Sequence, residues 1–289
     1  MNEGADLFLD EAELESGLEA ALARFQSKEV VSAPVGRVVA VLPSSGGSGA
    51  STLAVNLAAV LAKDHQQCAL LDLKPGRGDL AALLDLKPIF TLADLCLNVA
   101  RLDRAMFEKV IVQHPSGIHL VGSPQVFGGM RVVTSQGVGQ VLALARKLFP
   151  YVVVDLEDCF HEEQVLAVRQ AAVILLIVRL EFTSLRNARR ILEHLNELGV
   201  AANWVRLVAN RYGQPNELPV QEAEEALGGK LSYFIPEDAR TINGANNTGI
   251  PAVLKAPSAK VSQSMAQVAR HALERRRSDS APGARVLAR

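Results

Sequence analysis

The sequence predicts a single α/β domain with a doubly wound, mostly parallel β-sheet flanked by helices. Short runs rich in Val, Ile and Leu alternate with segments in which apolar residues recur at helical spacing. The 289 residues are 49% hydrophobic but only 4% aromatic, which suits a sheet that is covered on both faces by Ala, Val and Leu. A glycine-rich bend also joins the first apolar run to the first helical segment. Alternation, composition and bend therefore indicate the same fold class.

Seven apolar runs are predicted as strands. They span residues 38–42, 68–73, 118–121, 151–155, 173–178, 205–208 and 231–235. Helices are predicted from Ser51 onwards and over residues 92–97, 102–113, 136–149, 181–198 and 261–273. Thr91 is a candidate N-cap, Gly199 is a candidate helix stop, and residues 123–134 are predicted as a glycine-rich loop.

The chain is predicted to have three parts. Residues 1–36 form an acidic N-terminal helix and linker, because apolar residues recur at helical spacing between positions 14 and 25. This helix is either docked on the main domain with one solvated face or used to bind a partner. Residues 37–274 form the α/β domain, and residues 275–289 form an arginine-containing tail that we expect to be disordered.

Charge and cysteine usage narrow the classes of function. The net charge is −1, so a general affinity for nucleic acid or anionic membrane is not indicated. Cys68, Cys96 and Cys159 lie far apart without metal-ligand or CxxC spacing, which favours reduced thiols and a cytoplasmic protein. No apolar run approaches the ~20 residues of a membrane-spanning helix, so no span is expected.

The glycine-rich bend is the main candidate site, and it reads SSGGSGAST over residues 44–52. Strand, glycine-rich loop and helix in this order are typical of a phosphate-binding loop, because backbone N–H groups and the helix N-terminus together form an anion nest. An ordinary loop of this kind has a lysine where this chain has Ala50, whereas Ser51 retains a hydroxyl for magnesium. Since no cation lies in the loop, an ordinary strand–helix turn is the alternative interpretation.

The loop resembles the deviant Walker A loop of the ParA/MinD ATPases, KGGxGK[ST]T. Ser45 and Ala50 stand at the positions of the two family lysines. The form GGSGAST is similar to the GGVGAST of the CpaE/TadZ-like proteins of Tad pilus assembly, and SLRNARRIL at residues 184–192 resembles another segment of that branch. The resemblance covers about residues 38–273 and implies a P-loop NTPase fold of the ParA/MinD type, with ATP and Mg²⁺ as ligands.

The resemblance also assigns candidate ligand-binding residues. Those for the nucleotide are Gly46, Gly47, Ser48, Gly49, Ala50, Ser51, Thr52, Asn210, Arg211 and Pro236. Those for Mg²⁺ are Ser51, Asp72 and Asp155. Asp155 ends an apolar strand as in the Walker B pattern, and Asn210 stands where the family contacts the adenine edge.

Lys74 and Asp79 are the candidates in the segment that resembles switch I. In the family pattern DLDLxxGD, the second aspartate orients the attacking water, and Lys74 stands at its position. A carboxylate accepts a hydrogen bond from water, whereas an ammonium only donates. Lys74 either supplies the positive charge that the loop lacks or is a solvated loop lysine. Glu157 and Asp158 follow Asp155. One of these carboxylates is a candidate to help hold a metal; the alternative, which we favour, is that the two added negative charges weaken binding of a γ-phosphate.

The leading hypothesis is a CpaE/TadZ-like scaffold that binds ATP with little or no hydrolysis and organises a Tad-type pilus machine. By resemblance its partners are a second copy in a homodimer and pilus or secretion proteins, with recruitment to the inner face of the membrane or a cell pole. One alternative is an active ATPase in which Lys74 or Arg77 replaces the missing lysine. Another is a protein-interaction module without nucleotide. A role in DNA partition is disfavoured by the near-neutral charge.

Overall fold

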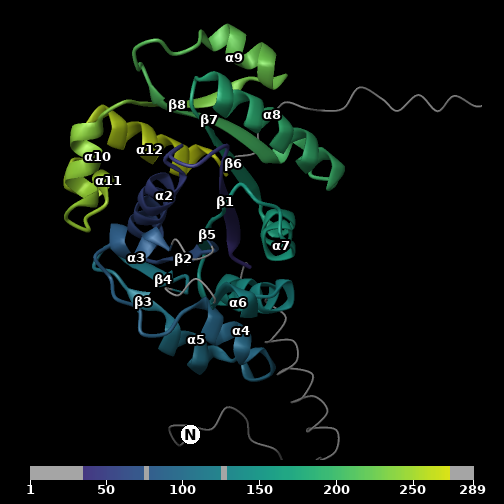
Figure 1. The fold of residues 1–289 in the computed structure, drawn as a ribbon. Coiled ribbons are helices and arrows are strands. Elements are labelled where there is room, and N and C mark those ends of the chain that lie inside the picture. The colour runs from purple at the N-terminus through teal and green to yellow at the C-terminus, as the bar shows by residue number, and fades with distance from the viewer. Residues whose placement is uncertain (1–34, 75–77, 125–128, 274–289) are drawn as a thin grey trace, which may run out of the picture. The chain divides into compact units, whose positions relative to one another are not determined.

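The structure is a computed structural model that describes residues 35–74, 78–124 and 129–273. At its centre lies an eight-stranded sheet in the order β3-β4-β2-β5-β1-β6-β7-β8 (Figure 1). The strands are β1 (Arg37–Pro43), β2 (Cys68–Asp72), β3 (Val112–Gln113), β4 (Ile118–Val121), β5 (Tyr151–Asp155), β6 (Val173–Val178), β7 (Val205–Tyr212) and β8 (Leu231–Pro236). All pairs are parallel except β3 with β4. This arrangement confirms the predicted doubly wound, mostly parallel sheet.

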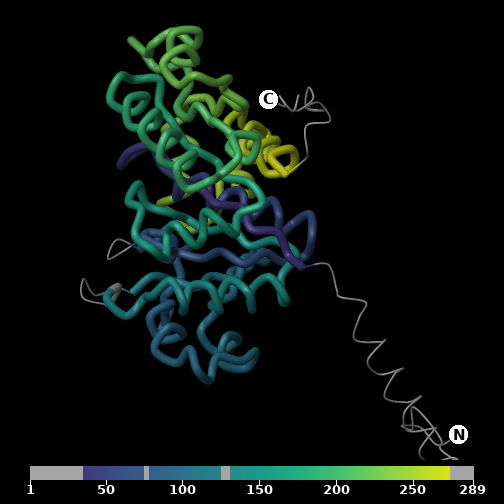
Figure 2. Tube along the Cα trace, turned by 90° about the vertical axis from the view of Figure 1, so that its right-hand side faces the viewer, coloured from purple at the N-terminus to yellow at the C-terminus, as the bar shows by residue number. Residues whose placement is uncertain are grey.

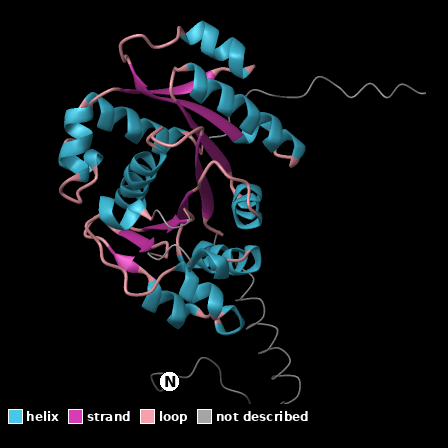
Figure 3. Cartoon of the chain, in the orientation of Figure 1, coloured by secondary structure: helices cyan, strands magenta, loops and turns pink. Residues whose placement is uncertain are grey.

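Helices cover both faces of the sheet (Figures 2 and 3). They are α2 (Ala50–His65), α3 (Asp79–Leu83), α4 (Leu92–Leu97), α5 (Arg104–Val110), α6 (Ser135–Leu148), α7 (Glu162–Gln170), α8 (Phe182–Glu197), α9 (Val220–Leu227), α10 (Ala239–Asn246), α11 (Ala252–Lys255) and α12 (Lys260–His271). Residues of α2, α3, α11 and α12 belong to one hydrophobic cluster, and residues of α4 to α9 belong to the other. Strand β1 contributes alternate residues to both clusters, as a strand buried on two faces must.

Three predicted elements differ from the structure. The strand predicted over 205–208 extends to Tyr212 as β7. The helix expected over 102–113 ends at Val110, and Val112 and Gln113 pair instead with β4 in antiparallel orientation. Ile111 leaves the helix with φ −67° and ψ 137°, which is consistent with the strand preference of a β-branched run. The loop expected over 123–134 contains a short 3₁₀ helix at Gly129–Val132.

The helix signals at Thr91 and Gly199 are confirmed. The Asp94 carboxylate accepts a 2.7 Å hydrogen bond from the Thr91 N–H, which completes a capping box at the start of α4. Gly199 has φ +78°, and beyond it the Val200 N–H donates to the Leu195 carbonyl. A glycine in the left-handed region that closes a helix in this way is a common helix stop.

The predicted parts at residues 1–36 and 275–289 lie almost wholly outside the described residues, so the domain boundaries stay predictions. No helix in the described ranges is long and apolar enough to cross a membrane.

Helix α2 is the central helix of its layer, and one polar residue ties it to its neighbours. Asn56 is buried, its Nδ2 donates to the Thr52 carbonyl over 2.8 Å, and its Oδ1 accepts from the Val253 N–H over 3.0 Å. The second bond joins α2 to the start of α11. A buried amide with both ends paired fixes the relative position of the two helices.

We expect Asn56→Leu to lower the free energy of unfolding by about 2 kcal/mol, because the Val253 N–H would be left buried without a partner. Urea unfolding followed by circular dichroism measures this change. Asn243→Ala, an exposed position on α10, is the control and should shift stability by less than about 0.5 kcal/mol. Equal effects in the two variants would contradict a structural role for Asn56.

The start of α2 depends on a glycine in a left-handed conformation. Gly49 has φ +90°, and a Cβ added there would overlap the Asn210 Nδ2. Gly46, three residues earlier, has open space around it. The two glycines of one loop are therefore under different constraints.

We expect Gly49→Ala to cost about 1–3 kcal/mol of stability, because it combines a strained φ with a steric overlap. Gly46→Ala, the matched control, should be nearly neutral. Thermal unfolding of both variants beside the parent tests the difference, and a neutral Gly49→Ala would show that the loop adapts.

Candidate functional site

The predicted site residues converge at the carboxyl edge of the sheet. The strand order reverses at β1, which lies between β5 and β6, and the glycine-rich loop follows β1. Asp72 ends β2 and Asp155 ends β5, and these two residues are register partners in the sheet. In open α/β sheets, ligands bind outside the carboxyl ends of the strands at such a reversal point. The fold therefore brings the loop and both aspartates to the position that binds ligands in this architecture.

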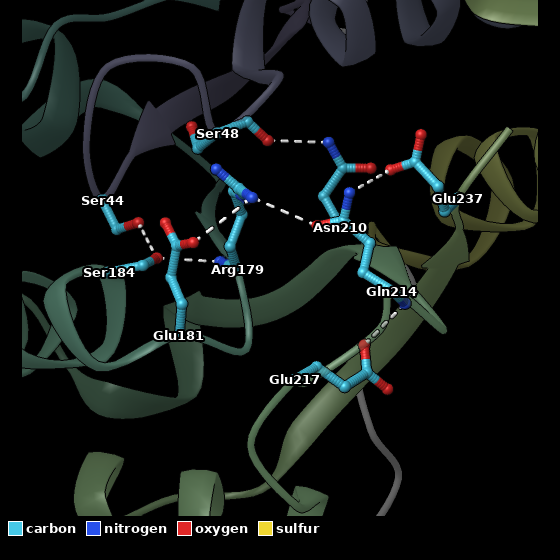
Figure 4. A network of polar contacts seen from close by, with 9 residues as sticks. All are labelled: Ser44, Ser48, Arg179, Glu181, Ser184, Asn210, Gln214, Glu217 and Glu237. Atoms are coloured by element: carbon cyan, nitrogen blue, oxygen red, sulfur yellow. Dashed lines mark hydrogen bonds and ion pairs between the residues drawn. The ribbon is translucent and has the colours of Figure 1, made fainter. Parts of the chain in front are cut away.

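The base of the loop is hydrogen-bonded to the end of β6 and to the first turn of α8. The Ser44 N–H donates to the Ile177 carbonyl, and the Ser44 and Ser184 hydroxyl oxygens lie 2.7 Å apart (Figure 4). The Ser184 Oγ also accepts a 2.8 Å bond from the Arg179 N–H. Both serines are buried, so the loop begins from a rigid base.

The tip of the glycine-rich loop is exposed to solvent, whereas the end of the loop that leads into α2 is largely buried. Gly46 and Gly47 are exposed, whereas Ser48 and Ala50 are buried. Ser51 and Thr52 lie in the first turn of α2, where the backbone N–H groups of a helix have no intrahelical partners. These unpaired donors, next to exposed glycines, are the feature that an anionic group requires.

The Lys74 side chain lies in the site. Its Nζ donates to the Ser51 Oγ over 2.6 Å and forms an ion pair with the Asp155 Oδ2 at 3.2 Å. Only 15% of the Lys74 side chain is exposed, so it is not the solvated loop lysine of the alternative interpretation. Its backbone is held on both sides, because its N–H donates to the Asp72 Oδ1 and its carbonyl accepts from the Ser123 Oγ.

Asp72 and Asp155 are almost wholly buried, and a nearby cation favours their charged forms. Burial, and then the neighbouring Asp155 carboxylate, raise the pKa of Asp72 to about 7. Burial also raises the pKa of Asp155, while the Lys74 ammonium opposes that rise. Two adjacent buried carboxylates repel each other, so the ammonium between Ser51 and Asp155 stabilises their charged forms.

The oxygen donors of Ser51, Asp72 and Asp155 have the chemistry that Mg²⁺ prefers. Their arrangement does not fit the ion, however, because the Lys74 Nζ lies within hydrogen-bonding or ion-pair distance of both Ser51 and Asp155. A divalent cation at the same position would be repelled by the ammonium. Elsewhere in the described residues, no group of three or more His, Cys, Asp or Glu is placed to hold a metal.

The other acidic candidates lie further out. Asp79 is exposed in the first turn of α3, and its charge contributes to raising the pKa of Asp155. Asp158 is exposed, and the Glu157 carboxylate accepts a weak bond from the Cys159 thiol. Their expected effect on a γ-phosphate stays a prediction. Arg77 lies outside the described residues.

Gln164 links two segments of the site, and sequence reasoning missed it. This α7 residue is buried, its Nε2 donates to the Leu73 carbonyl over 2.6 Å, and its Oε1 accepts from the Glu157 N–H over 3.2 Å. It therefore joins the backbone after β2 to the backbone after β5. The available signal was a glutamine among the apolar positions of α7, which is weak without the tertiary structure.

A second polar network lies on the β7 side of the loop (Figure 4). The Asn210 Nδ2 donates to the Ser48 carbonyl over 2.7 Å, so this amide fastens the loop itself. The Arg179 guanidinium contacts Gln214 at 3.1 Å and Glu181 at 3.2 Å. Sequence reasoning identified Asn210 but missed Arg179 and Gln214, because neither belongs to a local motif.

The remaining nucleotide candidates flank this network. Arg211 is exposed with φ +55°, at an irregularity in the pairing of β7 with β8. Pro236 ends β8, and the next N–H, that of Glu237, donates to the Tyr212 carbonyl. The structure thus brings the loop, Asn210 and Pro236 to one edge of the sheet. Their roles toward a nucleotide stay predictions.

Known proteins share this fold. A ParA family ATPase from Chlorobium tepidum superposes with a TM-score of 0.76 at 22% identity, over 81% of this chain and 99% of that one. The septum site-determining protein MinD of Pyrococcus horikoshii, solved in complex with Mg-ADP, gives 0.70 at 20% identity, over 81% and 94%. An uncharacterized ATP-binding protein of Methanocaldococcus jannaschii is 25% identical over 234 residues, which is 80% of this chain and 85% of the relative.

The sequence profile of one family covers most of the α/β domain. It matches residues 39–250, from β1 to the connection before α11, and it is described as the CobQ/CobB/MinD/ParA nucleotide binding domain. The matched range contains the glycine-rich loop, Lys74, both buried aspartates and Asn210. The chain belongs to the CobQ/CobB/MinD/ParA family of nucleotide-binding domains.

Proposed function

We propose that this protein binds ATP at the glycine-rich loop and acts as a scaffold with little or no hydrolysis. One observation carries this proposal. The Lys74 ammonium lies where the loop between β1 and α2 meets the helix, 2.6 Å from the Ser51 Oγ. Backbone donors at a helix N-terminus bind phosphate oxygens, and an adjacent cation supplies the charge that Ala50 cannot.

The proposal of weak hydrolysis rests on two features: the loop has no lysine, and the residue at the position of the water-orienting aspartate is a lysine. Ser45 and Ala50 carry no charge, and Lys74 cannot accept a hydrogen bond from an attacking water. Its ammonium is also engaged by Ser51 and Asp155. Loss of one electrostatic contact to a transition state typically costs about 3 kcal/mol, and several such losses would leave little turnover.

An active ATPase is the second candidate, and the position of Lys74 favours it over a nucleotide-free module. A lysine that reaches the Ser or Thr hydroxyl of a P-loop from the turn after a neighbouring strand lies near enough to contact the terminal phosphates. In that case Lys74 would replace the missing Walker lysine, and ATP turnover would drive cycling between monomer and dimer.

The biological role proposed here is that of the CpaE/TadZ-like branch, in which the protein localises or organises a Tad-type pilus machine as a homodimer. GGSGAST in the loop and SLRNARRIL in α8 support this assignment. Arg186 and Arg190 are exposed on α8, so they are accessible to a protein partner. The near-neutral charge disfavours nucleic acid as that partner.

We expect calorimetry to detect ATP binding with the parent protein and to show about three- to tenfold weaker binding for Ser51→Ala, the loss expected for one hydroxyl contact. Ser258→Ala removes an exposed hydroxyl after α11 and should bind as the parent does. Light scattering with and without ATP tests for a dimer. Absence of binding at millimolar ATP would contradict the proposed function and leave the interaction module.

Turnover separates the scaffold from the ATPase. For a scaffold, we expect phosphate release by the parent to equal that of Lys74→Ala and Asp155→Ala, because Lys74, which stands at the position of the water-orienting aspartate, cannot accept a hydrogen bond from the attacking water. Steady-state phosphate release measures this, with circular dichroism to verify folding of the variants. Turnover that disappears in both variants would establish the ATPase instead.

A further inference from the structure

The Lys74 ammonium lies where a phosphate-binding loop ordinarily has its metal. In such loops the Ser or Thr hydroxyl at the start of the helix is a ligand of Mg²⁺, and an aspartate at the end of a neighbouring strand stands behind the ion. Here the corresponding oxygens, Ser51 Oγ and Asp155 Oδ2, contact the Lys74 Nζ at 2.6 and 3.2 Å. One cation of the chain itself thus contacts both groups.

The surrounding contacts keep this ammonium in place. The Lys74 backbone is hydrogen-bonded to Asp72 through its N–H and to Ser123 through its carbonyl, so the side chain starts from a fixed position. If the side chain turned away, Asp72 and Asp155 would remain adjacent and buried without this positive charge. The carboxylates that would attract a metal therefore hold the lysine.

We propose that Lys74 replaces the divalent cation of this site, so that the protein excludes Mg²⁺ and binds the triphosphate of ATP without it. This inference rests on the proposed function for its ligand. The loop N–H groups contact the phosphate oxygens, and the ammonium contributes the positive charge that a metal provides elsewhere. The nucleotide bound is metal-free ATP.

Calorimetry of ATP binding in 5 mM Mg²⁺ and in excess EDTA tests the proposal. For the parent, we expect the two dissociation constants to agree within about threefold. For Lys74→Ala, which opens the space between Ser51 and Asp155, Mg²⁺ should tighten binding at least about tenfold. Lys87→Ala removes an exposed lysine and should behave as the parent does. A parent that binds ATP more than about tenfold better with Mg²⁺ would overturn the proposal.

Binding of Mn²⁺ alone decides the same question without nucleotide. Electron paramagnetic resonance should show a Mn²⁺ site on Lys74→Ala that is absent from the parent and from Lys87→Ala. If Lys74→Ala folds poorly, Lys74→Gln serves in its place, and Mn²⁺ should raise the melting temperature of the variant but not of the parent. A Mn²⁺ site on the parent that Asp155→Asn abolishes would overturn the inference.

The two proposals fail in different ways. If ATP binds in neither medium, the proposed function is wrong, and the Mn²⁺ titration still decides whether Lys74 excludes a metal. If ATP binds only with Mg²⁺, the proposed function stands and the replacement of the metal by Lys74 is wrong.

Discussion

The contact between the Lys74 ammonium and the buried Asp155 is the constraint on which the rest of the site depends. Lys74 lies in the turn after β2, and Asp155 lies at the end of β5. Ser51, in the first turn of α2, contacts the same ammonium through its hydroxyl. The pairing of β2 with β5 brings the two buried carboxylates together, and the ammonium offsets part of the cost of their burial as charged groups. Gln164 strengthens the same junction, because its amide joins the backbone after β2 to the backbone after β5.

The strands were predictable because each is a short apolar run between turn residues, and this pattern depends only on local sequence. Burial of both faces of β1 followed from the same pattern and is confirmed by the two clusters that its residues join. The end of the helix before β3 was not predictable from periodicity. Val110, Ile111 and Val112 suit a helix or a strand, and pairing with β4 decided between them. Pairing between strands therefore determined the secondary structure of this segment, for which the local sequence preference was ambiguous.

The positions of the site residues could be predicted from the sequence better than the contacts that their side chains make. The glycine-rich loop, Asp72 and Asp155 lie where the ends of strands predicted them, because parallel strands place their carboxyl ends at one edge. The direction of the Lys74 side chain was open, since a lysine after a strand can reach solvent or the site, and the two buried carboxylates decide the outcome. Residues that fasten the loop from a distance, such as Ser184 and Arg179, carry no local signal at all.

A cation that is part of the chain has consequences that a metal does not. It carries one positive charge in place of two, so it neutralises less of the charge on a triphosphate and less of the charge that develops during phosphoryl transfer. It also stays with the protein when nucleotide leaves, which makes occupancy of the site depend on ATP alone. The weaker neutralisation disfavours turnover, and it is consistent with Ser45 and Ala50 at the two positions where the deviant Walker A pattern has lysines. A site that already has one cation from the turn after β2 can hold a nucleotide without a second cation from the loop, whereas cleavage would require more positive charge near the phosphates.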